Sequence, residues 1–341
     1  MPCVVRSPLS CLPLCLVLGL AGGCGVPSFL ITPVSSSTRL QEHTVQSGKS
    51  GDKVAIIEVE GMLTNMRSGG FLQPTENKVS LFTQQMRAAA RDKSVKAVIL
   101  RINSPGGTVT ASDTMYEIVR DFRRRTKKPV IASTQEVCAS GAYYIACAAD
   151  TIVAHPTSVV GSIGVLFSTM EFEGALGKLG VRAESIKSGP LKDMGSPFKA
   201  LGRNERAVMQ EMVDEYFRRF VGVVDDARPV NEPRPTLPVA VDYAGVYSGR
   251  VFSGERAAEL GLADRTGRLE DAIKLARRMG KAKGAKVIMY RRPYGYGGSI
   301  YASADVNPPR AESDAGPNVL RLELPESRAF LPGGFYYLWE P

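Results

Sequence analysis

Between residues 53 and 154 the chain alternates unbroken apolar runs with stretches in which apolar residues recur at helical spacing. The first run, Lys53–Gly61, is rich in β-branched residues and ends at a glycine, which is typical of a buried strand. From Val79 to Ala90 apolar residues recur at intervals of three and four, which predicts an amphipathic helix. The same patterns continue as a strand at 95–102, a helix at 112–125, a strand at 128–133, a helix after residue 140 and a strand at 151–154. This alternation predicts βαβ units and a mostly parallel sheet.

The second half of the chain is predicted to be mainly helical. An apolar stripe predicts a long helix over 203–227, and a proline-rich stretch at 228–238 predicts a loop after it. Two shorter helices are expected, one between Ser253 and Gly261, which have the residue types of helix caps, and one over 269–279. A further strand is predicted at 181–186. The fold class is therefore α/β with additional C-terminal helices.

Both ends of the chain differ in pattern from this central part. Residues 285–341 are rich in Gly, Pro and Tyr and predict an irregular C-terminal arm, for which subunit contacts are one role. The aromatic run Phe335–Trp339 within it is expected to pack on the same subunit or on a neighbour, because water would otherwise surround the single tryptophan. Residues 24–52 are rich in Ser, Thr, Gly and Gln and predict a flexible tether.

Residues 1–23 have the pattern of an export signal. One basic residue, Arg6, precedes a short apolar run, and small residues stand immediately before Cys24. This arrangement resembles a bacterial lipoprotein signal, which would leave Cys24 as a lipid-modified N-terminus, although Ala21 stands where that pattern prefers leucine. An uncleaved signal anchor and ordinary cleavage nearby are the alternatives. With either anchor the protein lies outside the cytoplasm and is held at a membrane.

Composition and charge are those of a globular protein, with 44% hydrophobic and 23% charged residues. The net charge of +9 comes from scattered basic residues and no nucleic-acid-binding motif is present, so we expect no nucleic-acid partner. Only Cys138 and Cys147 lie beyond residue 24, and no cluster of histidines accompanies them. We therefore expect two small core residues rather than a disulfide framework or a metal site, and no cofactor.

Ser140 is the candidate nucleophile. It stands between a predicted strand and an apolar, helix-compatible run, so it is expected on a strand-to-helix turn. At such a turn the backbone N–H groups and the positive end of the helix dipole lie beside the side chain.

A second turn supplies candidate oxyanion donors. Asn103–Gly107, with the sequence Asn-Ser-Pro-Gly-Gly, follows the strand at 95–102, at the end of the sheet where α/β proteins place their ligands. The N–H groups of Gly106 and Gly107 could hold a developing oxyanion. An ordinary tight turn is the alternative when this motif is taken alone.

Taken together, the two segments resemble a known family. Ile102–Gly107 followed by Ala139–Tyr144 is similar to signal peptide peptidase A, the membrane-bound serine peptidases with a Ser–Lys dyad, and the resemblance extends from about Lys53 to about Lys283. It implies a peptidase domain at 53–284 with a fold like that of the Clp protease subunit and the crotonases, built of stacked ββα units. It also implies that the short form with one copy of the motifs assembles into a homo-oligomeric ring, whose subunits complete each other's dyads as one alternative.

The serine nucleophile also needs a base, a second group that takes the proton of its hydroxyl. Of the two histidines, His43 lies in the tether and His155 lies too early to match the Clp histidine, so a Ser–His pair is disfavoured. The resemblance assigns the role to Lys192, within Lys187–Pro197, with Lys187 as the competitor. It also gives Ser162 the role of orienting the lysine, although a simple turn serine is nearly as good an interpretation.

These observations predict a membrane-anchored serine endopeptidase that cleaves signal-peptide remnants or membrane-proximal polypeptides through an acyl-enzyme. Ser140 and Lys192 are the predicted catalytic pair, with Gly107 and Gly141, and also Gly106, as oxyanion donors. A crotonase-like acyl-CoA enzyme that uses the same turn is the alternative within enzymes. A non-catalytic membrane scaffold of the same fold is the alternative outside them.

Overall fold

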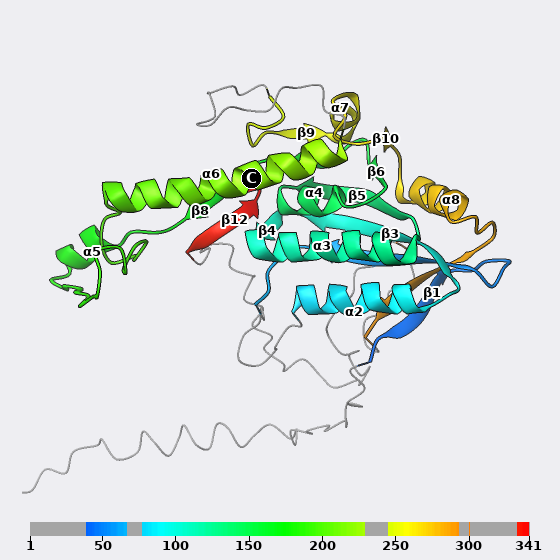
Figure 1. Ribbon diagram of the computed structural model, residues 1–341, viewed down its shortest axis with the longest axis horizontal. Helices are drawn as coiled ribbons and strands as arrows, with labels where there is room; N and C mark the ends of the chain where they lie inside the picture. The colour runs from blue at the N-terminus through cyan, green and yellow to red at the C-terminus, as the bar shows by residue number, and fades with distance from the viewer. Residues whose placement is uncertain (1–38, 67–76, 229–244, 293–299, 301–332, 341) are drawn as a thin grey trace, which may run out of the picture. The chain divides into compact units, whose positions relative to one another are not determined.

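The computed structural model describes residues 39–66, 77–228, 245–292, 300 and 333–340 (Figure 1). The chain divides into two units, Met1–Thr38 and Arg39–Pro341, and all described residues belong to the second. The export signal and Cys24 therefore lie outside the described residues, as does most of the predicted loop at 228–238. Among the described residues, no helix combines the length and the apolar character needed to cross a membrane.

A mostly parallel sheet forms the centre of this unit, with the strand order β1-β11-β2-β3-β5-β6-β10. Neighbours from β11 to β10 run parallel, whereas β1 is antiparallel to β11 and β9 is antiparallel to β7. A short branch continues from β5 to β7 and from β7 to β9. The strands are β1 (Gln41–Gln46), β2 (Lys53–Glu60), β3 (Val95–Ser104), β5 (Val130–Ala139), β6 (Thr151–Ala154), β7 (Val159–Gly161), β9 (Val251–Ser253), β10 (Arg265–Thr266) and β11 (Lys286–Arg291). The prediction of an α/β fold with a mostly parallel sheet is confirmed.

Helices cover both faces of this sheet, which explains why its strands are apolar on both sides. On β2, Ile57 packs into the cluster formed with α2, α3, α4 and α6, whereas its neighbour Ile56 packs into a second cluster with α8. Successive residues of a strand point to opposite faces, so one continuous apolar run serves two cores. The helices are α2 (Lys78–Arg91), α3 (Val109–Thr126), α4 (Gly141–Ala146), α5 (Glu173–Lys178), α6 (Arg203–Ala227), α7 (Gly254–Glu259) and α8 (Leu269–Met279).

Three parts of the predicted organisation are wrong at the level of individual elements. Gln41–Gln46, placed in the tether, form β1, and Lys286–Arg291, placed in the arm, form β11. These two strands pair with each other, and β11 also pairs with β2 at the centre of the fold. The strand predicted at 181–186 is absent, and these residues are exposed without a strand partner. Strand formation depends on a distant partner, which local patterns do not reveal.

A second, three-stranded sheet lies at one side of the first. Its order is β4-β12-β8, with β4 at Gly106–Thr108, β12 at Gly334–Leu338 and β8 at Leu166–Ser168, and β12 is antiparallel to both neighbours. In Figure 1 β12 is the red arrow beside β8, below α6. The aromatic run predicted to pack on a subunit therefore packs on its own chain as a strand, not as part of an irregular arm.

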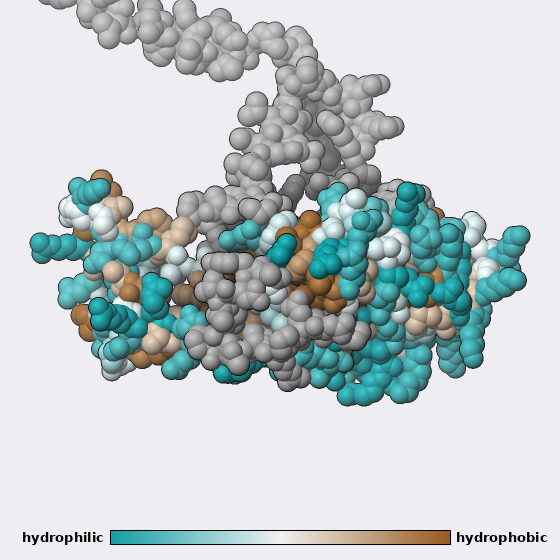
Figure 2. Space-filling view, turned by 90° about the horizontal axis from the view of Figure 1, so that it is seen from above, coloured by the Kyte–Doolittle hydropathy of each residue, from teal (hydrophilic) through white to brown (hydrophobic). Residues whose placement is uncertain are grey.

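The segment between β8 and α6 carries α5 and exposes several large apolar side chains. In the space-filling view, hydrophobic residues interrupt the hydrophilic surface at the end of the molecule that carries α5 (Figure 2). The exposed members from this segment are Met170, Phe172, Leu179, Val181, Ile186, Leu191 and Phe198. Exposed apolar surface of this kind is typical of sites of interaction.

Candidate active site

Ser140 lies on a sharp turn between β5 and α4. Its φ of 53° and ψ of −117° are rare for a residue with a side chain. Its N–H donates to the carbonyl of Gly161 at 2.7 Å, and its own carbonyl accepts from Tyr144 N at 2.9 Å, so both sides of the turn are held. A backbone conformation of this kind costs about 1–3 kcal/mol and persists where a structure requires a particular side-chain position.

The Ser140 side chain is enclosed. Only 1% of the residue is exposed, and its Oγ is buried without a hydrogen-bond partner among the described residues. An unpaired buried hydroxyl loses its hydration without compensation, which is unfavourable unless the group serves another purpose. The Ser140 hydroxyl thus contributes no side-chain hydrogen bond to the stability of the turn.

The glycine turn lies directly beside Ser140. A Cβ on Gly106, which has a φ of +101°, would stand 2.7 Å from the N of Gly141, so the two glycines approach at backbone distance. This closeness follows from the sheet, because β3 and β5 are neighbouring parallel strands and Ser104 pairs with Cys138. The side chain of Asn103 strengthens the connection by accepting from Val137 N at 3.1 Å.

The two candidate donors in the turn differ in their hydrogen bonds. The Gly106 N–H donates to Ser104 Oγ at 3.1 Å, and Ser104 Oγ in turn donates to Gly61 O at 2.6 Å. Gly107 belongs to β4, and a Cβ there would stand 1.9 Å from the carbonyl oxygen of Leu63. The commitment of the Gly106 N–H to Ser104 favours Gly107 and Gly141 as the donor pair.

Two residues that support this turn gave no signal in the sequence. Leu63 bonds to both sides of Gly107, because its N donates to Gly106 O at 2.8 Å and its carbonyl accepts from Thr108 N at 2.9 Å. Ser112, on α3, donates to Thr108 O at 3.0 Å, and its Oγ would stand 2.2 Å from a Cβ on Gly141. Both residues fix the turn through backbone proximity, which no residue pattern encodes.

Ser162 directly follows β7, the strand that pairs with the last residues of β5 before Ser140. It follows Gly161, whose carbonyl accepts from Ser140 N, and its own N donates to Arg250 O at 2.8 Å. Its φ is 53°, so two of the four described non-glycine residues with positive φ are serines at this site. The structure thus brings Ser162 near Ser140, together with Gly106, Gly107 and Gly141.

Lys192 is not brought to Ser140 within the described chain. It lies in a turn between β8 and α6, where its N donates to Gly189 O at 3.2 Å and its side chain is exposed. Its neighbour Asp193 instead accepts from Lys187 at 2.7 Å and pairs with Lys199 at 2.9 Å. Hydrogen bonds from Lys187 and Lys199 lower the pKa of Asp193 to about 2, so this carboxylate is neutralised by the two other lysines and not by Lys192.

The two histidines lie apart from these residues in the fold. His43 is on β1 and pairs with Met289 of β11. The ring of His155 stands at 3.0 Å from Thr157 Oγ, close to its own turn. Cys138 and Cys147 are buried and free, as expected of core residues.

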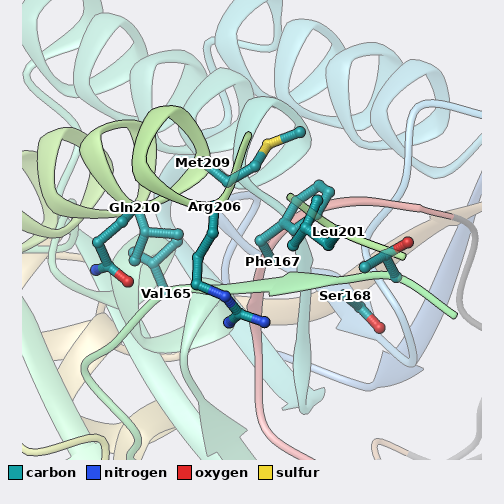
Figure 3. Close-up of a pocket in the computed structure, with 9 residues that line it drawn as sticks. Val165, Phe167, Ser168, Leu201, Arg206, Met209 and Gln210 are labelled. Atoms are coloured by element: carbon teal, nitrogen blue, oxygen red, sulfur yellow. The ribbon is translucent and has the colours of Figure 1, made fainter. Parts of the chain in front are cut away.

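A separate pocket of about 400 Å³ lies between β8 and α6, and none of the predicted site residues lines it (Figure 3). In the close-up the Arg206 side chain extends from α6 toward β8, whereas Phe167 belongs to β8 itself. Within the described residues no group of three or more His, Cys, Asp or Glu side chains is arranged to hold a metal ion.

Comparison with known proteins identifies the family to which this chain belongs. The model of peptidase family S49 matches residues 122–286, and that of Clp protease matches residues 52–160. An Enterococcus faecium protein named "Putative signal peptide peptidase SppA" is 34% identical over 257 residues, which cover 75% of this chain and 72% of the relative. The chain belongs to peptidase family S49. It is a serine peptidase of the SppA type.

Two further matches extend the comparison for this S49 peptidase. A protein of Methanocaldococcus jannaschii, named as a putative protease, is 38% identical over 200 residues, and the match spans 59% of this chain and 61% of the relative. A solved structure of a membrane-bound stomatin-specific protease matches 71% of this chain and 98% of its own, with a TM-score of 0.43 and 14% identity. Membership of the peptidase family favours the predicted peptidase over the two alternatives raised from the sequence, a crotonase-like acyl-CoA enzyme and a non-catalytic membrane scaffold.

Proposed function

We propose that this S49 peptidase is a membrane-anchored endopeptidase in which Ser140 is the nucleophile and Lys192 the general base. The observation that carries the proposal is the Ser140 turn, with its positive φ, its buried and unpaired Oγ, and Gly106 and Gly141 at backbone distance. A nucleophile between a strand and a helix, next to backbone N–H groups of glycines, is the arrangement that acyl transfer requires.

The proposed reaction follows from these positions. Neutral Lys192 takes the proton of Ser140, whose Oγ attacks the carbonyl carbon of a peptide bond. The N–H groups of Gly107 and Gly141 hold the oxyanion, and Lys192 returns the proton to the leaving amine before water hydrolyses the acyl-enzyme. Ser162 orients the lysine in this scheme.

Lys192 reaches Ser140 from a neighbouring copy in this proposal. Two observations support it: the Lys192 side chain is exposed within its own chain, and the segment that carries it exposes seven large apolar side chains. An oligomeric ring would bury these side chains and desolvate the lysine, and desolvation lowers a lysine pKa toward the range that a base needs.

Labelling of the purified protein with a fluorophosphonate tests the nucleophile and the base together. We expect labelling of the wild type at Ser140, none in Ser140→Ala, and a loss of peptide-amide cleavage in both Ser140→Ala and Lys192→Ala. Lys187→Ala is the matched control, because Lys187 is a nearby lysine that is engaged by Asp193. A Lys192→Ala variant with the wild-type rate would refute the dyad.

Mixing the two inactive variants tests whether the pair is shared between subunits. Ser140→Ala and Lys192→Ala proteins, dissociated and reassembled together, should recover part of the activity, because some sites then combine an intact serine with an intact lysine. Mixed assemblies that stay inactive would place both residues of each site in one chain.

The location and the substrates complete the proposal. Cys24 carries a lipid at the start of a tether, and the peptidase domain beginning near residue 53 cleaves signal-peptide remnants or other membrane-proximal polypeptides on the extracytoplasmic side. Replacement of Cys24 by alanine should move the protein from the membrane fraction to the soluble fraction. Retention of the variant in the membrane fraction would favour an uncleaved anchor.

A further inference from the structure

The side chain of Ser104 connects two stretches of backbone at the glycine turn. Ser104 is the last residue of β3 and has no exposed surface. Its Oγ donates to the carbonyl of Gly61 at 2.6 Å and accepts from the N–H of Gly106 at 3.1 Å. One buried hydroxyl therefore serves both partners at once, so the position of each partner depends on the other.

Gly61 begins a short segment, residues 61–63, that runs from the end of β2 to the glycine turn. The parallel pairing of β2 with β3 ends at Glu60 and Asn103. Beyond that point two hydrogen bonds hold Gly61 to β3, because its N donates to Asn103 O at 3.0 Å and its carbonyl accepts from Ser104 Oγ. The Ser104 hydroxyl thus fixes the 61–63 segment where it leaves the sheet.

The 61–63 segment sets the direction of the Gly107 N–H. Leu63 N donates to Gly106 O at 2.8 Å, and Leu63 O accepts from Thr108 N at 2.9 Å. Gly106 O and the Gly107 N–H belong to one peptide unit, and in a trans peptide these two groups point in opposite directions. The Gly107 N–H therefore points away from Leu63, and a displacement of the 61–63 segment would rotate this donor.

The same hydroxyl holds the other end of the turn through Gly106. Gly106 is buried, so its N–H would lose its acceptor if the Ser104 hydroxyl were removed. An unpaired buried N–H is unfavourable, which drives the backbone toward another acceptor. A glycine at a φ of +101° has no side chain to resist such a rotation. Loss of the hydroxyl would therefore release the turn at both of its attachments.

From these contacts we propose that Ser104 is a positioning residue for the peptidase reaction. Its hydroxyl holds the 61–63 segment and the Gly106 N–H in place, and thereby aims the Gly107 N–H at the oxyanion. The inference rests on the proposed function, with Ser140 as nucleophile and Gly107 as a donor. Ser104 touches no reacting atom in this scheme, so its contribution is expected in kcat and not in the binding of substrate.

Steady-state kinetics of the full-length protein, on a peptide amide that the wild type cleaves, test this role. Ser104→Ala should lower kcat at least tenfold and change KM less than threefold. Ser104→Cys keeps a side chain of similar shape that is a weak donor and acceptor, so its kcat should fall as well. A wild-type kcat in Ser104→Ala would overturn the proposal. A wild-type kcat in Ser104→Cys would also overturn it, because packing would then be the whole role of the residue.

Ser158→Ala is the matched control for the loss of a buried hydroxyl. Ser158 is 1% exposed, and its Oγ donates to His155 O and accepts from Thr134 Oγ, both at 2.8 Å. Each of the two alanine variants removes a bridging hydroxyl, so both should lower the thermal unfolding temperature. Ser158→Ala should keep kcat within threefold of the wild type. An equal loss of kcat in the two variants would show a general effect of destabilisation and overturn the proposal.

A double-mutant cycle tests whether Ser104 acts through the Gly107 donor. If it does, Ser104→Ala should lower kcat less than threefold when Gly107 is already replaced by alanine, against at least tenfold in the wild type. Independent, fully additive losses would refute the connection between the two residues. Fluorophosphonate labelling separates this result from a failure of the proposed function. A wild type labelled at Ser140 together with additive losses removes the inference alone, whereas a wild type without label at Ser140 removes the nucleophile and the inference with it.

Discussion

Substitution of Gly107 by alanine is the sharpest test of the proposed oxyanion site. A Cβ at this position would lie 1.9 Å from the Leu63 carbonyl oxygen and 2.6 Å from both Leu63 C and Leu63 N. All three are backbone atoms, so no side-chain rotation relieves the contact. The distance between this Cβ and the Leu63 carbonyl oxygen must increase by more than ~1 Å to reach an ordinary contact of about 3.5 Å. β4 must move by that amount.

The expected magnitude follows from the geometry that an oxyanion requires. A donor must stand about 2.7–3.1 Å from the oxyanion, and loss of one such donor lowers kcat about 10²–10³-fold, or about 2.7–4 kcal/mol of barrier. A displacement near 1 Å removes Gly107 N from that range, so we expect Gly107→Ala to lose kcat by this factor while KM changes far less.

Steady-state kinetics on a peptide ester, with thermal unfolding to verify the fold, measure this effect. Gly164→Ala is the matched control, because its Cβ would meet Gly249 at 3.5 Å, an ordinary contact, at a glycine two residues after Ser162. A folded Gly107→Ala protein with kcat within threefold of the wild type would refute the role of Gly107 as a donor. A loss of the same size in Gly164→Ala would show that the assay reports general strain.

Three further predictions concern the surroundings of the site. Phe220→Ala should lower the free energy of unfolding by about 3–5 kcal/mol, measured by chemical denaturation, because Phe220 is fully buried against Tyr144; a loss below 1 kcal/mol would contradict this packing. Burial raises the pKa of the Cys147 thiol to about 11, so iodoacetamide at pH 8 should modify Cys147 only after unfolding; rapid alkylation of the native protein would show an open core. Asp193→Asn should increase hydrogen exchange in the segment around it at neutral pH, since the wild-type carboxylate bonds to two lysines. Its pKa is lowered in the folded state, so this stabilisation is complete above about pH 4 and is lost as the pH falls toward 2; a difference between variant and wild type that stays constant over that range would exclude the ion pairs as its cause.

The separation of Ser140 from Lys192 gives the exposed segment between β8 and α6 a physical role. A single chain encloses the proposed nucleophile and leaves the proposed base in solvent. In the proposed mechanism, assembly with a neighbouring copy brings the two together, and the variant-mixing experiment examines this requirement.

Local patterns in the sequence determined most of the elements around the site. The helix predicted over 203–227 matches the observed Arg203–Ala227, because its apolar stripe and its end before a proline-rich stretch are local signals. The strand-to-helix position of Ser140 was also visible. Its closeness to Gly106 and Gly107 follows once the strands before the two motifs are parallel neighbours. The sequence therefore indicated the candidate nucleophile and its candidate donors together.

Only the tertiary structure decided which distant segments pair. Gln41–Gln46 and Lys286–Arg291 form strands because they pair with each other and the second also pairs with β2. Gly334–Leu338 forms a strand because it pairs with β4 and β8. Residues 181–186 have a strand-like pattern and no partner, so they form no strand. A strand satisfies its backbone hydrogen bonds through other strands, whereas a helix satisfies them within itself. For that reason the sequence located the longer helices and the Ser140 turn, but not α5 or the strands at residues 41–46, 286–291 and 334–338.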